Sequence, residues 1–346
     1  MSRAGRVAFL LIFAWLLGSV CYEAELVTHG DHYFKFAQQD YNILIGKADI
    51  DGFQQRLLPS FAIDLISKIL GQSYEYATFI THRVLYLAIS ISMVTMLYFI
   101  LGLSVEISAG LLFAFSVANI FTLDAGYWVM TFDLVTELFT IIMFMIFLSS
   151  QSLLAKFTQY LILFVLWQFS FEEVIYIPML IAFALNADDI RSFNAVNMLK
   201  RPINYVLVAL VGISMLITTY TRHSYAVAPL HGGSTEFLGQ WIVVKENIGL
   251  IGRQLMILPM TFGTLKDGFW WTQGAGLFLI IAFLGGLVML RGGTRDGRHF
   301  AVKLMFITMA IITFIFARLE EVNTFLPLVV ALFLLTAFRF RAPTTE

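Results

Sequence analysis

Long apolar stretches recur along almost the whole chain, and they constrain the fold more than any other feature of the sequence. An α-helix needs roughly 20 mostly apolar residues to cross the hydrocarbon core of a bilayer. The candidate spans by that measure are 7–27, 79–102, 105–122, 127–149, 153–170, 173–186, 203–220, 271–290, 303–317 and 322–338. We therefore expect an all-α fold, a polytopic transmembrane bundle of about ten helices, in which residues 1–346 form a single integral membrane domain.

The composition excludes several other classes of protein. Hydrophobic residues make up 59% of the chain and charged residues 13%, whereas soluble domains are about a quarter charged and a little under half apolar. The net charge of −1 gives no basic excess for binding nucleic acid. With Cys21 as the one cysteine, neither an intrachain disulfide nor a cysteine metal cluster is expected.

Basic residues predict the orientation of the spans. Arg3 and Arg6 precede the first span, and Val20 and Cys21 stand where signal peptidase cleavage needs small residues. We expect an uncleaved first helix, with the N-terminus and, after an even number of spans, the C-terminus in the cytoplasm. The short loops and tails on that side would then hold Arg3, Arg6, Lys156, Arg191, Lys200, Arg201, Arg291, Arg295, Arg298, Lys303, Arg339 and Arg341, in line with the positive-inside rule.

Two long outer loops, 28–78 and 221–270, hold most of the remaining polar sequence. In the first loop, polar residues recur at helical spacing over 56–70, which predicts an amphipathic helix lying in the membrane interface. The stretch 247–262 is apolar but interrupted by glycine, arginine and proline, so it suits a re-entrant or interfacial helix. No internal repeat of the kind found in many transporters is present.

Polar residues at the expected outer face are the candidate functional groups, although each also has an ordinary explanation. Asp31 follows the first span and could be a general base or metal ligand, or a turn residue after Gly30. Asp124 lies in a very short expected outer turn, 122–126. Six connections or helix ends contribute Asp31, His32, Arg56, Asp124, Glu172, Glu173, Arg222, His223, Arg318 and Glu320 to the same face. Together these residues predict a cavity with carboxylates for base chemistry and arginines for an anionic group, although arginines at a membrane face also snorkel.

Two further acids lie within the fourth expected span. Asp133 and Glu137 are four residues apart and therefore share a helix face. Asp133 is close enough to the outer end to reach water, whereas Glu137 is deeper and suits an internal partner.

Nucleotide and hydrolase motifs are missing from the sequence. It has no Walker phosphate loop, GxGxxG fingerprint, GxSxG elbow or HExxH helix. We therefore expect an activated donor or energy source that is already in the membrane or outside it.

The order of these features resembles the GT-C superfamily of integral membrane glycosyltransferases, which take sugar from a polyprenyl-phosphate carrier on the outer or luminal face. The resemblance covers most of the chain in layout. It rests on Asp31 to Ala37, Gln54 to Pro59, Glu172-Glu173 with Pro178, and Arg318 to Pro327. Where the family often has Asp-Glu or Asp-Asp, this chain has Asp31-His32.

The resemblance implies an enzyme that transfers a hexose or pentose with inversion at the anomeric carbon. Asp31 would be the catalytic base and Asp124 would assist, while Arg56, Arg222 or Arg318 would hold the carrier phosphate. The remaining substrate-binding residues would be His32, Tyr33, Glu172, Glu173, His223 and Glu320. The implied partners are a polyprenyl-phosphate-linked sugar, a lipid or glycan acceptor and membrane lipids. The resemblance names no certain cofactor and leaves a divalent metal ion open.

Three alternatives stay open at this point. A polymerase that joins lipid-linked polysaccharide repeats would depend more on the arginines than on Asp31. A transporter or flippase would use Glu137 as its coupling residue. An accessory subunit of a membrane complex would have no chemistry of its own. Because no eukaryotic sorting signal is evident, we expect a bacterial inner membrane as the location.

Overall fold

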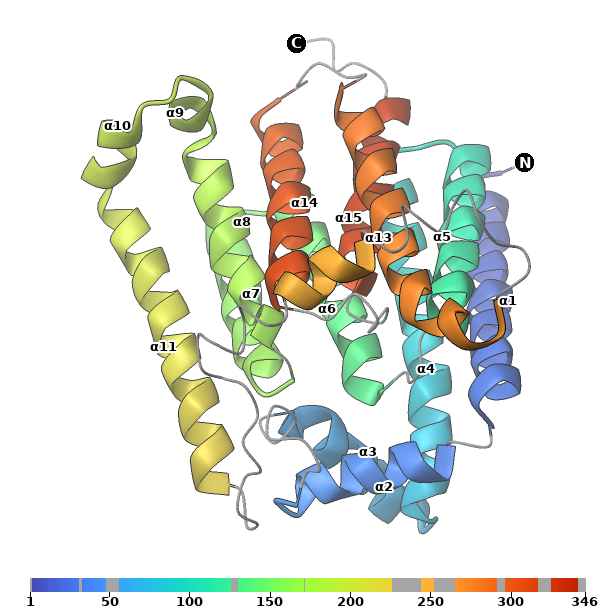
Figure 1. Ribbon diagram of the computed structural model, residues 1–346. Helices are drawn as coiled ribbons and strands as arrows, with labels where there is room; N and C mark the ends of the chain where they lie inside the picture. Colours follow the sequence, from blue (N-terminus) through green and yellow to red (C-terminus); the bar gives the residue numbers. More distant parts are fainter. Residues whose placement is uncertain are drawn as a thin grey trace.

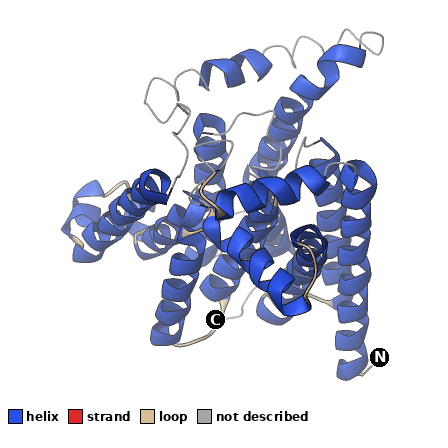
Figure 2. Ribbon diagram, turned by 90° about the horizontal axis from the view of Figure 1, so that it is seen from below, coloured by secondary structure: helices blue, strands red, loops and turns tan. Residues whose placement is uncertain are grey.

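The computed structural model describes residues 2–30, 33–47, 56–125, 130–170, 172–225, 244–251, 265–290, 296–316 and 325–341. Every secondary-structure element in these ranges is a helix (Figures 1 and 2). The apolar helices are α1 (Arg3–His29), α4 (Tyr74–Val94), α5 (Val105–Ala125), α6 (Thr131–Leu148), α7 (Leu153–Gln168), α8 (Tyr176–Leu185), α11 (Pro202–Tyr225), α13 (Leu265–Leu290), α14 (Gly297–Phe316) and α15 (Leu326–Phe340).

Shorter elements connect these helices. They are α2 (Tyr33–Leu44), α3 (Leu57–Leu70), the π-helix η3 (Thr95–Ile100), the 3₁₀-helix η4 (Glu172–Ile175), α9 (Ala187–Arg191) and α10 (Ala195–Lys200). Residues 244–251 are helical as well.

Five of the described helical segments are long and apolar enough to cross a membrane. They are Arg3–Thr28, Tyr74–Ile100, Thr131–Leu148, Pro202–Thr221 and Gly297–Ile315. Shorter apolar helices occupy the other five expected ranges. The all-α fold is therefore confirmed for the described residues, and five of their helical segments have the length and composition of membrane spans, while the count of about ten spans stays a prediction.

The two ends of the bundle differ in what they carry. Helix α1 begins, and α15 ends, at the end that also holds α9 and α10, whereas α2 and α3 lie at the opposite end (Figure 1). Seen from that opposite end, short helices cross the ends of the bundle helices (Figure 2). In this arrangement the start of α1 and the end of α15 lie on one side, and α2 and α3 lie on the other; which side faces the cytoplasm stays a prediction.

The first long loop contains the helix that its polar periodicity predicts. Helix α3 ends at Gly71, whose φ of 61° is in the left-handed region that glycine adopts without strain. The backbone N–H of Leu58 donates to the carbonyl of Phe169 at 2.8 Å, and the Tyr74 hydroxyl donates to the carbonyl of Ser60 at 3.1 Å. These bonds attach α3 to the end of α7 and the start of α4. Its place in a membrane interface stays a prediction.

Helix α6 lies at the centre of the bundle. Of its residues 78% are buried, compared with 11% of those in the span of α11. It packs against α4, α7 and α15, whereas α11 contacts chiefly α8, η4 and α7. Polar groups on α6 are therefore enclosed by protein, which makes their partners important for the site.

Several expected boundaries differ from those of the structure; α4 already begins at Tyr74 and not at 79, for example, and α14 at Gly297 and not at 303. Helix α5 continues to Ala125, so Asp124 lies in its last turn and not in a free turn. Helix α11 continues to Tyr225, and α13 already begins at Leu265, so helical backbone extends into both ends of the range 221–270, whose place outside the membrane stays a prediction. In each case an apolar run ends before the helix does, because a helix continues through polar residues that keep helical backbone angles. Of the expected helix over 247–262, residues 252–262 lie outside the described residues.

Helices α1 and α4 approach each other closely at Gly18. A Cβ atom at this position would lie 2.9 Å from the carbonyl oxygen of Tyr86 and 3.1 Å from the Cα of Leu87. Both obstacles are backbone atoms, so they cannot rotate away. The glycine is therefore required for the spacing between these two helices.

We expect Gly18→Ala to destabilise the protein by about 1–3 kcal/mol, because the added methyl group forces α1 and α4 apart. Thermal unfolding of the purified protein in detergent measures the change. Gly110→Ala on α5 is the matched control, since nothing lies within 4 Å of a Cβ there. The control should be neutral or stabilising by up to about 1 kcal/mol. Equal midpoints for the two variants would contradict the close approach.

Candidate functional site

Four polar residues from four different helices form one continuous hydrogen-bonded chain. His82 Nδ1 on α4 lies 2.9 Å from Glu25 Oε1 on α1, and His82 Nε2 lies 2.9 Å from Thr131 Oγ1 on α6. The Thr131 hydroxyl donates to Asp40 Oδ2 on α2 at 2.7 Å. The order is thus Glu25, His82, Thr131, Asp40, and we call these four residues the buried chain.

Each member of the buried chain is fully enclosed, with an exposed fraction of 0%. Each carboxylate at its two ends uses one oxygen in the chain. The second oxygens, Glu25 Oε2 and Asp40 Oδ1, are buried and have no hydrogen-bond partner among the described residues. A buried carboxylate with an unsatisfied oxygen is costly, so its presence in an apolar bundle points to a functional reason.

Local structure explains how α2 and α6 present their groups. On α2, Ala37, Asp40 and Ile43 recur at a spacing of three residues, and all three are buried. On α6, the side chain of Asp133 accepts a hydrogen bond from the backbone N–H of Met130 at 2.9 Å and thereby caps the helix start. Thr131 is the first residue of this capped helix.

The surroundings of Asp40 favour its protonated form. Burial raises the pKa of the Asp40 carboxyl from 3.8 to about 6, and the nearby Asp133 acts in the same direction. The hydrogen bond from Thr131 and the charge of His82 act against this rise in pKa. Asp40 is therefore able to gain or lose a proton near neutral pH.

Arg56 brings a cation to the same end of α6. Its side chain is buried, and the guanidinium carbon lies 4.1 Å from the ring centre of Phe132. Phe132 is the residue between Thr131 and Asp133. A guanidinium beside a helix start can hold an anion such as a phosphate.

A second buried carboxylate lies further along α6. Glu137 Oε1 accepts a hydrogen bond from the side-chain amide of Asn119 on α5 at 2.6 Å. The other oxygen, Glu137 Oε2, has no hydrogen-bond partner among the described residues. Asn119 is therefore the internal partner that the depth of Glu137 in its span predicts. Asp133, in contrast, is only 4% exposed, so the idea that it reaches water was wrong.

The structure places some of the predicted site residues and leaves others undescribed. Arg56 lies over the ring of Phe132, the residue that follows Thr131 in α6. Helical backbone is described for Tyr33 at the start of α2, Asp124 in α5, Glu172 and Glu173 in η4, and Arg222 and His223 near the end of α11. Helix α11 ends at the same end of the bundle as α2 and α3 (Figure 1). Asp31, His32, Arg318 and Glu320 lie outside the described residues.

Sequence reasoning missed Glu25, Asp40, His82 and Thr131. Two signals could have found three of them. Glu25 and His82 are ionisable residues inside apolar spans, and such residues are functional candidates by default. Asp40 occupies the apolar face of a short amphipathic helix, where an acid is not expected.

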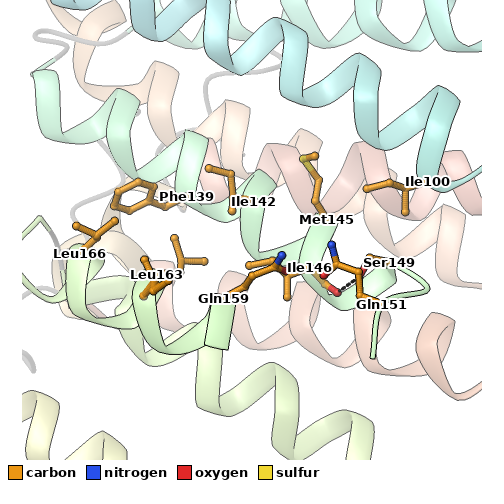
Figure 3. A pocket seen from close by; sticks show the side chains of 11 residues that line it. Ile100, Phe139, Ile142, Met145, Ile146, Ser149, Gln151, Gln159, Leu163 and Leu166 are labelled. Atoms are coloured by element: carbon orange, nitrogen blue, oxygen red, sulfur yellow. Dashed lines mark hydrogen bonds between the residues drawn. The ribbon is translucent and has the colours of Figure 1, made fainter. Parts of the chain in front are cut away.

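A separate apolar groove of about 420 Å³ opens between α6 and α7, next to η3 (Figure 3). Phe139, Ile142 and Ile146 contribute from α6, and Leu163 and Leu166 from α7. The Ser149 hydroxyl at its polar end donates to the carbonyl of Ile146 at 2.9 Å. The groove follows the part of α6 beyond Glu137, so it does not open onto the buried chain.

Comparisons add no relative to these observations: no family model, curated protein or solved structure matches this chain. Within the described ranges, no group of three histidine, cysteine or acidic side chains is arranged to hold a metal ion.

The raised pKa of Asp40 predicts a pH-dependent stability. Because folding raises the pKa of this acid, its contribution to stability is full below pH 3.8 and is lost as the pH rises toward 6. An asparagine side chain does not ionise, so the stability of Asp40→Asn relative to the wild type should improve by on the order of 1–3 kcal/mol between pH 4 and pH 7. Thermal unfolding in one detergent over this range measures the difference.

Asp64→Asn is the control for this comparison. Asp64 lies on α3, where it is paired with Lys68 at 2.6 Å near the surface. Its relative stability should not improve with rising pH. If the two variants followed the same pH dependence, the assignment to buried Asp40 would be refuted.

Proposed function

We propose that this protein is a membrane glycosyltransferase that moves a sugar from a polyprenyl-phosphate-linked donor to an acceptor on the outer membrane face. The observation that carries the proposal is the folding of the first long loop. This loop lies across one end of the bundle as α2 and α3 and brings Asp40 and Arg56 to the start of α6. Asp31 lies two residues before the start of α2 in the sequence and therefore belongs to the same connection.

The proposed chemistry needs a base and a phosphate-binding cation. Asp31 takes the proton from an acceptor hydroxyl or amine while that atom forms a bond to the anomeric carbon. The bond between the anomeric carbon and the carrier phosphate breaks, and the phosphate leaves as an anion. Arg56 supports this step because a guanidinium stabilises the charge that develops on the leaving phosphate.

The same proposal sets the membrane orientation. We assign the end with α2 and α3 to the outer face and both termini to the cytoplasm, as the distribution of basic residues favours. A bacterial inner membrane is the proposed location. The donor then reaches the site from within the membrane, which agrees with the lack of nucleotide-binding motifs in the sequence.

The lipid part of the proposal predicts a bound carrier. Mass spectrometry of lipids that co-purify in mild detergent should find a polyprenyl phosphate or its glycoside in the wild type. Arg56→Ala should reduce that lipid at least tenfold, because removing one charge-assisted contact costs about 1.5–3 kcal/mol. Arg83→Ala, an exposed arginine on α4, is the control and should keep the lipid. Only bulk phospholipid, unchanged in all three proteins, would speak against the carrier.

The base is tested by transfer activity. With undecaprenyl-phosphate-linked hexoses and pentoses as probes, we expect Asp31→Asn to slow release of undecaprenyl phosphate by about 10²–10⁴-fold, since general base catalysis contributes on that scale. Asp64→Asn should retain the wild-type rate. Full activity of Asp31→Asn would remove Asp31 from the catalytic role.

A second candidate function is ion-coupled transport, and Glu137 favours it. This carboxylate is buried in the most enclosed of the long apolar helices, and one of its oxygens has no partner among the described residues. Glu137→Gln keeps the oxygen that accepts from Asn119 but cannot ionise. Sugar transfer with this variant should continue if the protein is a transferase, whereas a coupled transporter would lose its ion dependence.

A further inference from the structure

We propose that Glu25, His82, Thr131 and Asp40 form a proton relay, which carries a proton between Asp40 at the loop end of the bundle and Glu25 in the first membrane helix. The three contacts of the buried chain lie between 2.7 and 2.9 Å. These are distances at which protons transfer between oxygen and nitrogen atoms without movement of the backbone.

Counting hydrogens shows that the chain can point in either direction. Thr131 has one hydroxyl hydrogen. When it donates to Asp40 Oδ2, it must accept from His82, so Nε2 carries a hydrogen. For a neutral imidazole, Nδ1 then accepts from a protonated Glu25.

The reverse arrangement satisfies the same contacts. A protonated Asp40 donates to Thr131, Thr131 donates to His82 Nε2, and the hydrogen on Nδ1 faces an ionised Glu25. No hydrogen bond is lost between the two arrangements. They differ only in which carboxylate holds the proton and in the tautomer of His82.

The step between them is balanced. The Glu25 hydrogen moves to His82 Nδ1, the hydrogen on Nε2 moves to Thr131, and the Thr131 hydrogen moves to Asp40 Oδ2. One proton has then passed from Glu25 to Asp40, and one negative charge has passed in the opposite direction. No bond between heavy atoms changes and no further reactant is needed.

The two ends of the buried chain distinguish a proton relay from a hydrogen-bond network that only holds the helices together. Such a structural network is most stable when every buried polar atom has a partner. Here each terminal carboxylate has a buried oxygen that lacks one among the described residues. These oxygens, Glu25 Oε2 and Asp40 Oδ1, are the points where a proton can enter or leave the chain.

Charged and titratable neighbours set the balance between the two arrangements. Asp133 on α6 acts electrostatically on both Asp40 and His82, and the charge of Asp40 acts on Tyr74 at the start of α4. Near the other end, the charge of Glu25 acts on Tyr22, which lies on the same helix. The negative charge of Asp133 opposes an ionised Asp40 and therefore favours the arrangement in which Asp40 holds the proton.

The relay does not depend on the proposed sugar transfer. It can therefore be tested on the resting protein with no donor lipid. The full-length protein, labelled with ¹⁵N-histidine in lipid nanodiscs, would be followed by NMR. His82→Gln assigns the His82 signals among the six histidines. In the wild type we expect ring-nitrogen shifts averaged between the two neutral tautomers.

The variants separate the relay from ordinary packing. Asp40→Asn cannot exchange a proton, so the His82 shifts should move to the limit of one tautomer. Thr131→Val removes the hydroxyl and should also abolish the exchange, whereas Thr131→Ser should preserve it. Asp64→Asn should leave the wild-type signals. A single tautomer in the wild type, or exchange that survives in Asp40→Asn or Thr131→Val, would overturn the relay.

If Thr131→Val fails to fold, Thr131→Ser and Asp40→Asn still test the relay. Both substituted side chains keep an oxygen that can hydrogen-bond to the next residue of the buried chain. Averaged shifts in Thr131→Ser together with limiting shifts in Asp40→Asn would support the relay. Identical shifts in the two variants would refute it.

Discussion

Enclosing carboxylates inside an apolar bundle is the constraint on which the rest of this structure depends. A buried acid must find hydrogen-bond partners within the protein, since neither lipid nor water supplies them there. A hydrogen bond between Glu25 and His82 holds α1 against α4, and one between Thr131 and Asp40 holds α2 against α6. His82 also contacts Thr131, so the four helices are joined through one histidine. The apolar packing around them supplies stability, but these polar contacts define which helices meet at this end of the bundle.

This arrangement makes the first loop part of the bundle core. Helix α2 is outside the long apolar segments, but its Asp40 reaches a fully buried position among them. Helix α3 is held from the other side, where Leu58 bonds to Phe169 at the end of α7. A loop attached in this way can present a residue such as Arg56 at a defined place. That is the requirement a site at the membrane surface has to meet, whichever substrate it takes.

The sequence predicted those features that depend on local patterns. Length and hydropathy are sufficient to find the apolar helices, and the spacing of polar residues over 56–70 is sufficient to find α3. The buried chain could not be found in this way. His82 pairs with Glu25 across 57 positions, and Thr131 pairs with Asp40 across 91. No periodicity encodes such pairings, and averaging over a window conceals a single acid or histidine within an apolar run. At Asp124 a local pattern was misleading, because the aspartate and glycine of 122–126 favoured a turn where helix α5 continues to Ala125.

The contact at Gly18 and the hydrogen bond between Glu25 and His82 together restrict the relative movement of α1 and α4. Helices α1 and α4 are joined at both places, which lie seven residues apart on α1 and therefore about 10 Å apart along its axis. Two contacts on one pair of helices oppose both sliding and rotation of α1 against α4. The hydrogen bond between Thr131 and Asp40 in turn attaches α2 to α6, so the first loop is connected to this pair of helices through His82.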